Sequence, residues 1–205
     1  MNETLTTGGA SEFAHSSYGR RADAERNRES ILDAAVHLLA TDPAVGMTEI
    51  AGASGIGRAT LYRHFPTREG LLEAIVQRAF ADAEAAIDAA RLAQGTAAEA
   101  LSRLVAGLLS LGDRYRFIFM QDVVFPKGES ACVPEERMGA PIVGLIERGQ
   151  STGEFTSALP AAWMAAAAGA VIAMGIREAA LGRITERDLA EDVTRLIMGG
   201  ISASD

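Results

Sequence analysis

Apolar residues recur at helical spacing along most of this chain. In residues 67–93 they occupy positions i, i+3 and i+4, which is the pattern of a helix with one buried face. Segments at about 97–112, 114–124, 135–150, 160–181 and 185–199 follow the same period, as does a shorter one at 31–40. Strand-like alternation is weak throughout, and short stretches with Gly or Pro separate the segments. The pattern predicts an all-α protein.

Two short helices with a tight Gly-rich turn between them are expected within residues 46–69. Gly55 stands where the end of the first helix needs a positive φ, and Ile56 is then free to fill the angle between the helices. Pro66 ends the second helix, and Thr67 can cap the helix that follows. The arrangement is typical of a helix-turn-helix, in which the second helix enters a DNA groove.

The second of these helices has two faces of different chemistry. At about 100° per residue, Leu61 and Phe65 lie about 40° apart, whereas Arg63 lies about 200° from Leu61. The apolar pair therefore anchors the helix, and Arg63 can reach a guanine edge, while hydroxyl and ring groups beside it can hold phosphates. The candidate DNA-contacting residues of this region are Thr48, Arg58, Ala59, Thr60, Tyr62, Arg63, His64 and Arg68.

The run from Gly55 to Glu69, GIGRATLYRHFPTRE, resembles the DNA-binding signature of the tetracycline-repressor (TetR) family of transcriptional regulators. The segment ILDAAVHLLA at 31–40 is similar to the first helix of that family, and the likeness covers about residues 24–75. Gly46 and Gly57 depart from the pattern, because the family often has Ser or Thr there, and Gly caps a helix without a side-chain oxygen.

The resemblance implies an N-terminal helix-turn-helix DNA-binding domain at 20–68 and a C-terminal helical domain at 69–205 that binds an effector and dimerises. It also implies a repressor that binds a palindromic operator as a homodimer and is released by an unknown small molecule. Met and aromatic side chains suit the walls of such an effector site. The candidate wall residues are Phe80, Phe117, Phe119, Met120, Phe125, Trp163, Met164 and Met174, with Gln121 or Asp122 as polar contacts.

The segment at 160–181 is unusually apolar. Pro160 to Ile176 contains 17 residues without a charge, which is near the lower bound for a membrane span. Ala and Gly dominate it, and they allow close helix packing, so a helix at a subunit contact is the better interpretation. In the TetR resemblance the last two helices form a four-helix bundle with a second subunit, and the last helix offers a matching face of Leu189, Val193, Leu196 and Ile197. We therefore expect a two-fold dimer and no membrane association.

Composition restricts the remaining possibilities. The net charge of −8 argues against indiscriminate coating of nucleic acid, but the charged residues from Arg58 to Arg68 are all arginines. The single cysteine, Cys132, excludes an internal disulfide and fits a reducing, cytoplasmic location. Neither a metal site nor a cofactor is expected, since the three histidines lack ligand spacing. Residues 1–19, rich in Gly, Ser and Thr, are expected to form a disordered tail that contains no signal peptide.

The sequence disfavours two other classes of function. Residues 52–57 resemble the nucleotide loop of short-chain dehydrogenases, but their glycines are spaced G-x-x-G-x-G, and no apolar strand precedes them. The only lysine, Lys127, has Val123 rather than Tyr four residues before it, so an enzyme is disfavoured. A helical dimeric interaction module without specific DNA binding is the alternative, and the intact outer face of residues 58–64 speaks against it.

Overall fold

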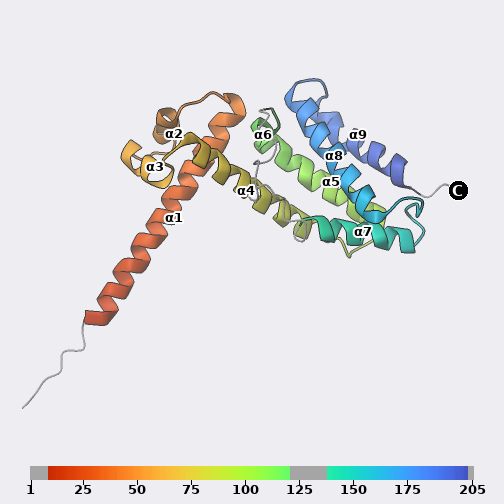
Figure 1. The fold of residues 1–205 in the computed structure, drawn as a ribbon, viewed down its shortest axis with the longest axis horizontal. Coiled ribbons are helices and arrows are strands. Elements are labelled where there is room, and N and C mark those ends of the chain that lie inside the picture. Colours follow the sequence, from red (N-terminus) through yellow and green to blue (C-terminus); the bar gives the residue numbers. More distant parts are fainter. Residues whose placement is uncertain (1–8, 121–137, 203–205) are drawn as a thin grey trace, which may run out of the picture. The chain divides into compact units, whose positions relative to one another are not determined.

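The computed structural model describes residues 9–120 and 138–202 and shows a helical protein, as the sequence predicts (Figure 1). Outside helices, the described part holds turns, loops and one isolated antiparallel bridge between Phe155 and Ser202. The helices are α1 (Gly9–Thr41), α2 (Met47–Ala53), α3 (Arg58–His64), α4 (Arg68–Ala89), α5 (Ala97–Arg114), α6 (Arg116–Met120), α7 (Ala140–Ser151), α8 (Ala161–Ala180) and α9 (Glu186–Ile201). The chain divides into two compact units, Met1–Leu72 and Glu73–Asp205.

The first unit is built from α1, α2 and α3, which pack on one another. The buried side of α1 follows the predicted helical period, and α2 and α3 each contribute a short apolar face. The buried residues are Ile31, Leu32, Ala35, Val36, Leu39, Val45, Ile50, Ala51, Leu61, Phe65 and Leu71. A small core of this kind holds α3 through one face only and leaves the other face to solvent.

Helix α1 begins ten residues or more before the predicted first helix. The expectation of a disordered tail at 1–19 therefore needs correction for residues 9–19, which are helical; residues 1–8 lie outside the described part. Extending a helix that already exists costs far less than nucleating one, and the stretch GASEFAHSSYG contains no proline to stop it.

The second unit contains a helical core in which α8 contacts α5, α6, α7 and α9, and α5 also contacts α7 and α9 (Figure 1). Its core draws on every one of the helices α5, α7, α8 and α9, together with Phe155. Gly149 on α7 allows the Phe155 ring to pack against the helix backbone, because an added Cβ there would lie 2.1 Å from Phe155 Cδ2. The ring is thereby fixed beside the end of α9.

The helix bounds follow local signals in the sequence. Helix α5 starts with a capping box, in which Thr96 Oγ1 accepts from the Glu99 N–H at 3.1 Å and Glu99 Oε2 accepts from the Thr96 N–H at 3.0 Å. The segment predicted at 114–124 is helical in α6 from Arg116 to Met120, and its remainder lies outside the described residues. The helix predicted at 135–150 is α7, Ala140–Ser151.

Among the described helices, α8 is long and apolar enough to cross a membrane, by length and composition only. One of its faces packs in the core of the second unit through Met164, Ala168, Ile172 and Ile176. Within the chain 28% of its apolar stretch is buried, so the interpretation of α8 as a helix at a subunit contact stays a prediction.

Candidate DNA-contacting helix and ligand cavity

The turn between α2 and α3 has the geometry that its glycines predict. Gly55 adopts φ +69°, a left-handed conformation that side-chain-bearing residues disfavour. Ser54 Oγ accepts a hydrogen bond from the Ile56 N–H at 3.3 Å, and Ile56 is half-buried between the helices. The connection between α2 and α3 thus takes only residues 54–57.

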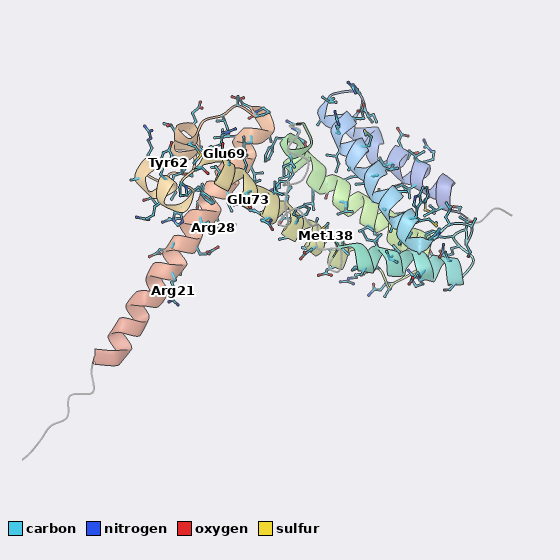
Figure 2. All side chains as sticks on the ribbon, in the orientation of Figure 1. Arg21, Arg28, Tyr62, Glu69, Glu73 and Met138 are labelled. Carbon is cyan, nitrogen blue, oxygen red and sulfur yellow. The ribbon has the colours of Figure 1, made fainter. Side chains whose placement is uncertain are left out.

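Helix α3 separates its residues by face. Leu61 is fully buried and the following Phe65 is 5% exposed, whereas Tyr62 on the same helix is 41% exposed (Figure 2). Arg58, Ala59 and Arg63 are also exposed, and Thr60 is half-buried. The exposed residues of α3 therefore form one continuous outer face, with two guanidinium groups, a phenol and a small alanine.

His64 differs from its neighbours. It is half-buried, and its Nε2 is shielded from solvent without a hydrogen-bond partner among the described residues. Its ring lies 6.4 Å from that of Phe65, measured between centroids. Part of this imidazole is therefore buried against the protein.

Helix α2 presents the remaining predicted contact, since Thr48 lies exposed in its first turn. Gly46 offers no side-chain cap, but Glu49 Oε2 accepts from the Gly46 N–H at 3.0 Å. Half of a capping box therefore survives the substitution of the usual Ser or Thr by Gly, and it holds the start of α2.

Arg68, a predicted phosphate contact, makes hydrogen bonds within the protein. Its guanidinium donates hydrogen bonds to the carbonyl oxygens of Val45 and, at 2.8 Å, of Pro43. Both carbonyls belong to the loop between α1 and α2, and the Arg68 side chain is half-buried. The two bonds tie the first residue of α4 to that loop.

Arg28 is a residue that the sequence reasoning did not single out for this role. Its guanidinium carbon lies 5.7 Å from the centroid of the Phe65 ring, and its Nη1 lies 3.3 Å from Glu29 Oε1. The contact joins α1 to the residue that follows α3. Because the two residues are distant in sequence, no local motif signals their pairing.

The second unit contains an apolar cavity of about 340 Å³. Helices α4, α5, α6, α7 and α8 contribute to its wall. Met138, labelled in Figure 2, lies just before α7 and also lines the cavity. The lining residues are Val76, Ala79, Phe80, Ala83, Leu108, Leu111, Gly112, Tyr115, Ile118, Met138, Ile142, Gly169, Ile172, Ala173 and Ile176. The size falls within the range of pockets for small molecules.

Tyr115 carries the one hydroxyl among these lining residues. The hydroxyl donates to Asp82 Oδ2 at 2.6 Å, and Arg114 Nη1 lies 3.3 Å from the same oxygen. Burial of Tyr115 and its hydrogen bond to Asp82 raise the pKa of the phenol to about 12. The phenol therefore stays protonated at neutral pH and joins α4 to the turn between α5 and α6.

The predicted wall residues are only partly found at this cavity. Phe80 lines it, whereas Phe117 and Met164 are buried elsewhere in the core. Trp163 is 60% exposed and Met174 53% exposed on the outer face of α8, so neither lines the cavity. The side chains of Phe119 and Met120, and the whole of Gln121, Asp122 and Phe125, lie outside the described part.

The sequence reasoning favoured large aromatic side chains and so missed most of the wall. Ala79, Ala83 and Gly169 line the cavity because they are small, and leave the space that a larger side chain would fill. Val76 and Ala79 belong to the apolar period noted for 67–93, which was the available signal. Periodicity alone does not tell a cavity wall from a filled core.

Helices α8 and α9 also carry apolar residues that the described chain leaves uncovered. Trp163 and Met174 lie on α8, and Leu196 on α9 is 64% exposed. Gly199 and Gly200, exposed near the end of α9, have open space where a Cβ would stand. Large apolar side chains exposed on two adjacent helices are typical of an interaction surface.

Comparison with known proteins identifies relatives of both units. The family model described as "Bacterial regulatory proteins, tetR family" matches residues 31–75. The HTH-type transcriptional repressor LfrR of Mycolicibacterium smegmatis is 36% identical over 108 residues, which are 53% of this chain and 57% of LfrR. An uncharacterised HTH-type transcriptional regulator of Mycobacterium tuberculosis is 52% identical over 61 residues, 29% of each chain. The chain thus aligns with little more than half of the curated relative.

A solved structure extends the likeness to the whole fold. The crystal structure of the TetR-like regulator LfrR from Mycobacterium smegmatis in complex with proflavine is similar to this chain at a TM-score of 0.69 and 28% identity. The similarity covers 88% of this chain and 99% of that one. The arrangement of an N-terminal helix-turn-helix and a helical C-terminal unit is therefore shared along nearly the full length.

Proposed function

We propose, from the premise that this chain belongs to the TetR family of bacterial regulatory proteins, that it is a transcriptional regulator which binds operator DNA and releases it when a small molecule binds. The single observation that carries the proposal is the division of α3 into a buried apolar face and an exposed face of Arg58, Ala59, Tyr62 and Arg63. A helix held in this way can lie in a major groove without unfolding its support.

The exposed residues divide into two roles. Arg63, at the middle of the outer face, reads a base edge, and Ala59 beside it lets the backbone approach the groove. Arg58, Thr60, Tyr62 and Thr48 bind phosphates and set the register of the helix on the duplex. Arg68 positions the helix-turn-helix from within, through the carbonyls of Pro43 and Val45. His64 contributes packing rather than a phosphate contact.

The proposed DNA-binding form is a homodimer that associates through α8 and α9. The exposed Trp163, Met174 and Leu196 support this surface, because burial of such residues against a second copy is favourable. Two copies of α3 related by a two-fold axis fit an operator with inverted repeats. Such a dimer works in the cytoplasm as a repressor, and the relative LfrR, itself a transcriptional repressor, supports this regulatory sign.

The apolar cavity is the proposed effector site, and α4 is the element that both functions share. Arg68, at the first turn of α4, holds the α1–α2 loop, while Val76, Ala79 and Phe80 farther along the same helix line the cavity. A ligand that displaces the wall of the cavity therefore acts on the helix that also braces the helix-turn-helix. The relative LfrR forms a complex with proflavine, and this supports a small-molecule effector for the present chain.

Selection from a random duplex library tests this proposal. The purified chain should enrich an inverted repeat, and a footprint on the enriched duplex should show two protected half-sites about one helical turn apart. A matched selection with Arg63→Ala should enrich the repeat weakly, since the base-reading group is gone. Retention of random DNA by the unchanged chain, without enrichment of any sequence, would contradict the proposal and leave a dimeric interaction module in its place.

A further inference from the structure

The wall of the cavity carries no ionisable group that is charged at neutral pH, among the described residues that line it. Fourteen of its positions are aliphatic, aromatic or glycine, and the fifteenth, Tyr115, is the only one with a polar side chain. A ligand inside this wall meets methyl, methylene and ring groups on every described side. Binding to such a wall is favoured by the apolar area that the ligand buries, and the described lining residues offer no opposite charge to an ion.

The carboxylate that accepts the Tyr115 hydrogen bond is already compensated. Asp82 Oδ2 accepts a hydrogen bond from the Tyr115 hydroxyl at 2.6 Å and another from Arg114 Nη1 at 3.3 Å. Arg114 also lies over the Tyr115 ring, 5.5 Å from its centroid. The carboxylate thus has both a cation and a hydrogen-bond donor of its own, so it exerts little attraction on a cationic ligand.

Transfer of an ion from water into such a cavity is costly. A charged group without a partner loses part of its hydration against this wall and gains no charged partner among the described lining residues, whereas an uncharged aromatic molecule loses little. The size also fits a molecule of two or three fused or linked rings, since pockets for small molecules start at about 300 Å³.

From these three observations we propose that the cavity is selective for uncharged, predominantly apolar aromatic molecules and discriminates against ions of the same shape. The proposal rests on the effector role assigned to this cavity above and names the chemical class of the effector. It sets this chain apart from LfrR, whose structure holds proflavine, a cationic tricyclic amine.

Matched pairs of probes test the selectivity directly, in the absence of DNA. Acridine and proflavine share a tricyclic skeleton, and at mildly alkaline pH acridine is neutral while proflavine remains protonated. N-phenyl-1-naphthylamine and 8-anilinonaphthalene-1-sulfonate share a second skeleton, and only the latter is an anion. Titration of the full chain, followed by calorimetry or probe fluorescence, should give a Kd at least about tenfold lower for the neutral member of each pair.

Two variants locate the binding site. Gly169 is an exposed lining residue with open space at its Cβ position, so Gly169→Leu should occupy part of the cavity and weaken binding of the neutral probes at least about tenfold. Gly144 on α7 also has open space at its Cβ position and does not line the cavity, so Gly144→Leu should leave binding unchanged. Circular dichroism and sedimentation confirm that both variants keep the fold and oligomeric state of the parent.

A third variant tests the role assigned to the compensated carboxylate. Arg114→Gln removes the cation that lies 3.3 Å from Asp82 and should narrow the gap between acridine and proflavine, because the carboxylate then attracts the cationic probe more strongly. The naphthalene pair should keep its preference for the neutral member.

The outcomes separate this inference from the proposed function. Tighter binding of proflavine than acridine, absence of binding by both neutral probes, or equal binding in Gly169→Leu and the parent would overturn the inference, whatever DNA the chain binds. Absence of sequence-selective DNA binding, with the probe selectivity intact, would overturn the regulator function and leave the ligand class standing.

Discussion

Leu61 and Arg63 stand two residues apart on α3, yet one is fully buried and the other is exposed. The angular period of a helix predicts this separation from the sequence alone, because residues about 200° apart cannot share a face. The helical period does not predict which groups a long side chain at a helix end will contact. Arg68 reads as a basic surface residue, but its guanidinium bonds two backbone carbonyls more than twenty residues earlier.

Replacement of Arg63 by alanine should reduce operator discrimination by about 1–3 kcal/mol, because a bidentate contact to a base edge is lost. Fluorescence anisotropy on the operator and on random duplex DNA measures the difference. Arg58→Ala should instead weaken both complexes and flatten the salt dependence, since a phosphate contact is removed. Arg183→Ala, an exposed arginine in the second unit, is the control. Equal loss on both duplexes from Arg63→Ala would assign Arg63 to the backbone.

The buried phenol of Tyr115 should make stability depend on pH in the alkaline range. Its pKa is raised from the usual 10.0 to about 12, so the folded chain retains a proton that the unfolded chain loses. The contribution is fully present below pH 10 and is lost progressively as pH rises to about 12. The difference in urea midpoint between the parent and Tyr115→Phe should shrink over this range. Tyr62→Phe is the matched control, and a constant difference would contradict the assignment.

At the level of the element, the turn between α2 and α3 depends on one backbone conformation. Gly55 has φ +69°. The sequence predicts this positive φ because Gly55 follows a short apolar helix. The cavity wall could not be predicted in the same way, because it is assembled from five helices, α4, α5, α6, α7 and α8. A small residue can either line an empty space or pack against a neighbouring helix. The outcome depends on contacts between helices, which cannot be predicted from one segment of the sequence.

Substitution of Gly55 by alanine should destabilise the first unit by roughly 1–2 kcal/mol, because a Cβ disfavours the left-handed conformation. Gly52→Ala is the matched control: Gly52 lies in α2, its Cβ position is open, and alanine there should stabilise the helix by up to about 1 kcal/mol. Thermal unfolding of both variants measures the two effects. Stability changes of the same sign would show that the turn does not require glycine.

Removal of the Arg68 guanidinium should destabilise the helix-turn-helix more than it alters the electrostatics of DNA binding. Arg68→Ala loses two charge-assisted hydrogen bonds, which corresponds to about 1–3 kcal/mol of unfolding free energy. Arg68→Lys should recover only part of it, since an ammonium lacks the planar fork. Chemical denaturation together with the salt slope of binding separates the two roles. If Arg68→Ala left the unfolding free energy unchanged but made DNA binding less dependent on salt, Arg68 would instead be a phosphate contact.

The whole molecule combines a small helix-turn-helix unit with a larger helical unit that carries the cavity and an uncovered apolar surface. The sequence predicted both units through the period of its apolar residues and through the TetR resemblance of residues 24–75. It placed Trp163 at the cavity, but that ring is exposed on the outer face of α8, on the side proposed for the partner subunit. Burial in an assembly and burial in a cavity leave the same apolar signature in a sequence.

A charge on the proposed dimer surface should separate the subunits. Leu196→Glu places a carboxylate at a position that is 64% exposed in the isolated chain, and burial of that charge at a subunit contact is costly. Sedimentation should show a shift from dimer to monomer, and operator affinity should fall because two half-sites are no longer bound together. Leu159→Glu, at a 40% exposed leucine before α8, should remain dimeric. If the Leu196→Glu variant remained dimeric, the subunit interface would have to lie on another surface of the chain.

The claim that α3 reads duplex sequence is tested most directly by one ratio: the Kd for random duplex DNA divided by the Kd for the selected operator, both measured at physiological salt. Sequence-specific regulators bind their sites about 10³-fold or more tighter than random DNA. The account predicts a ratio in that range for the unchanged chain. A ratio close to one, with the fold intact, would contradict it.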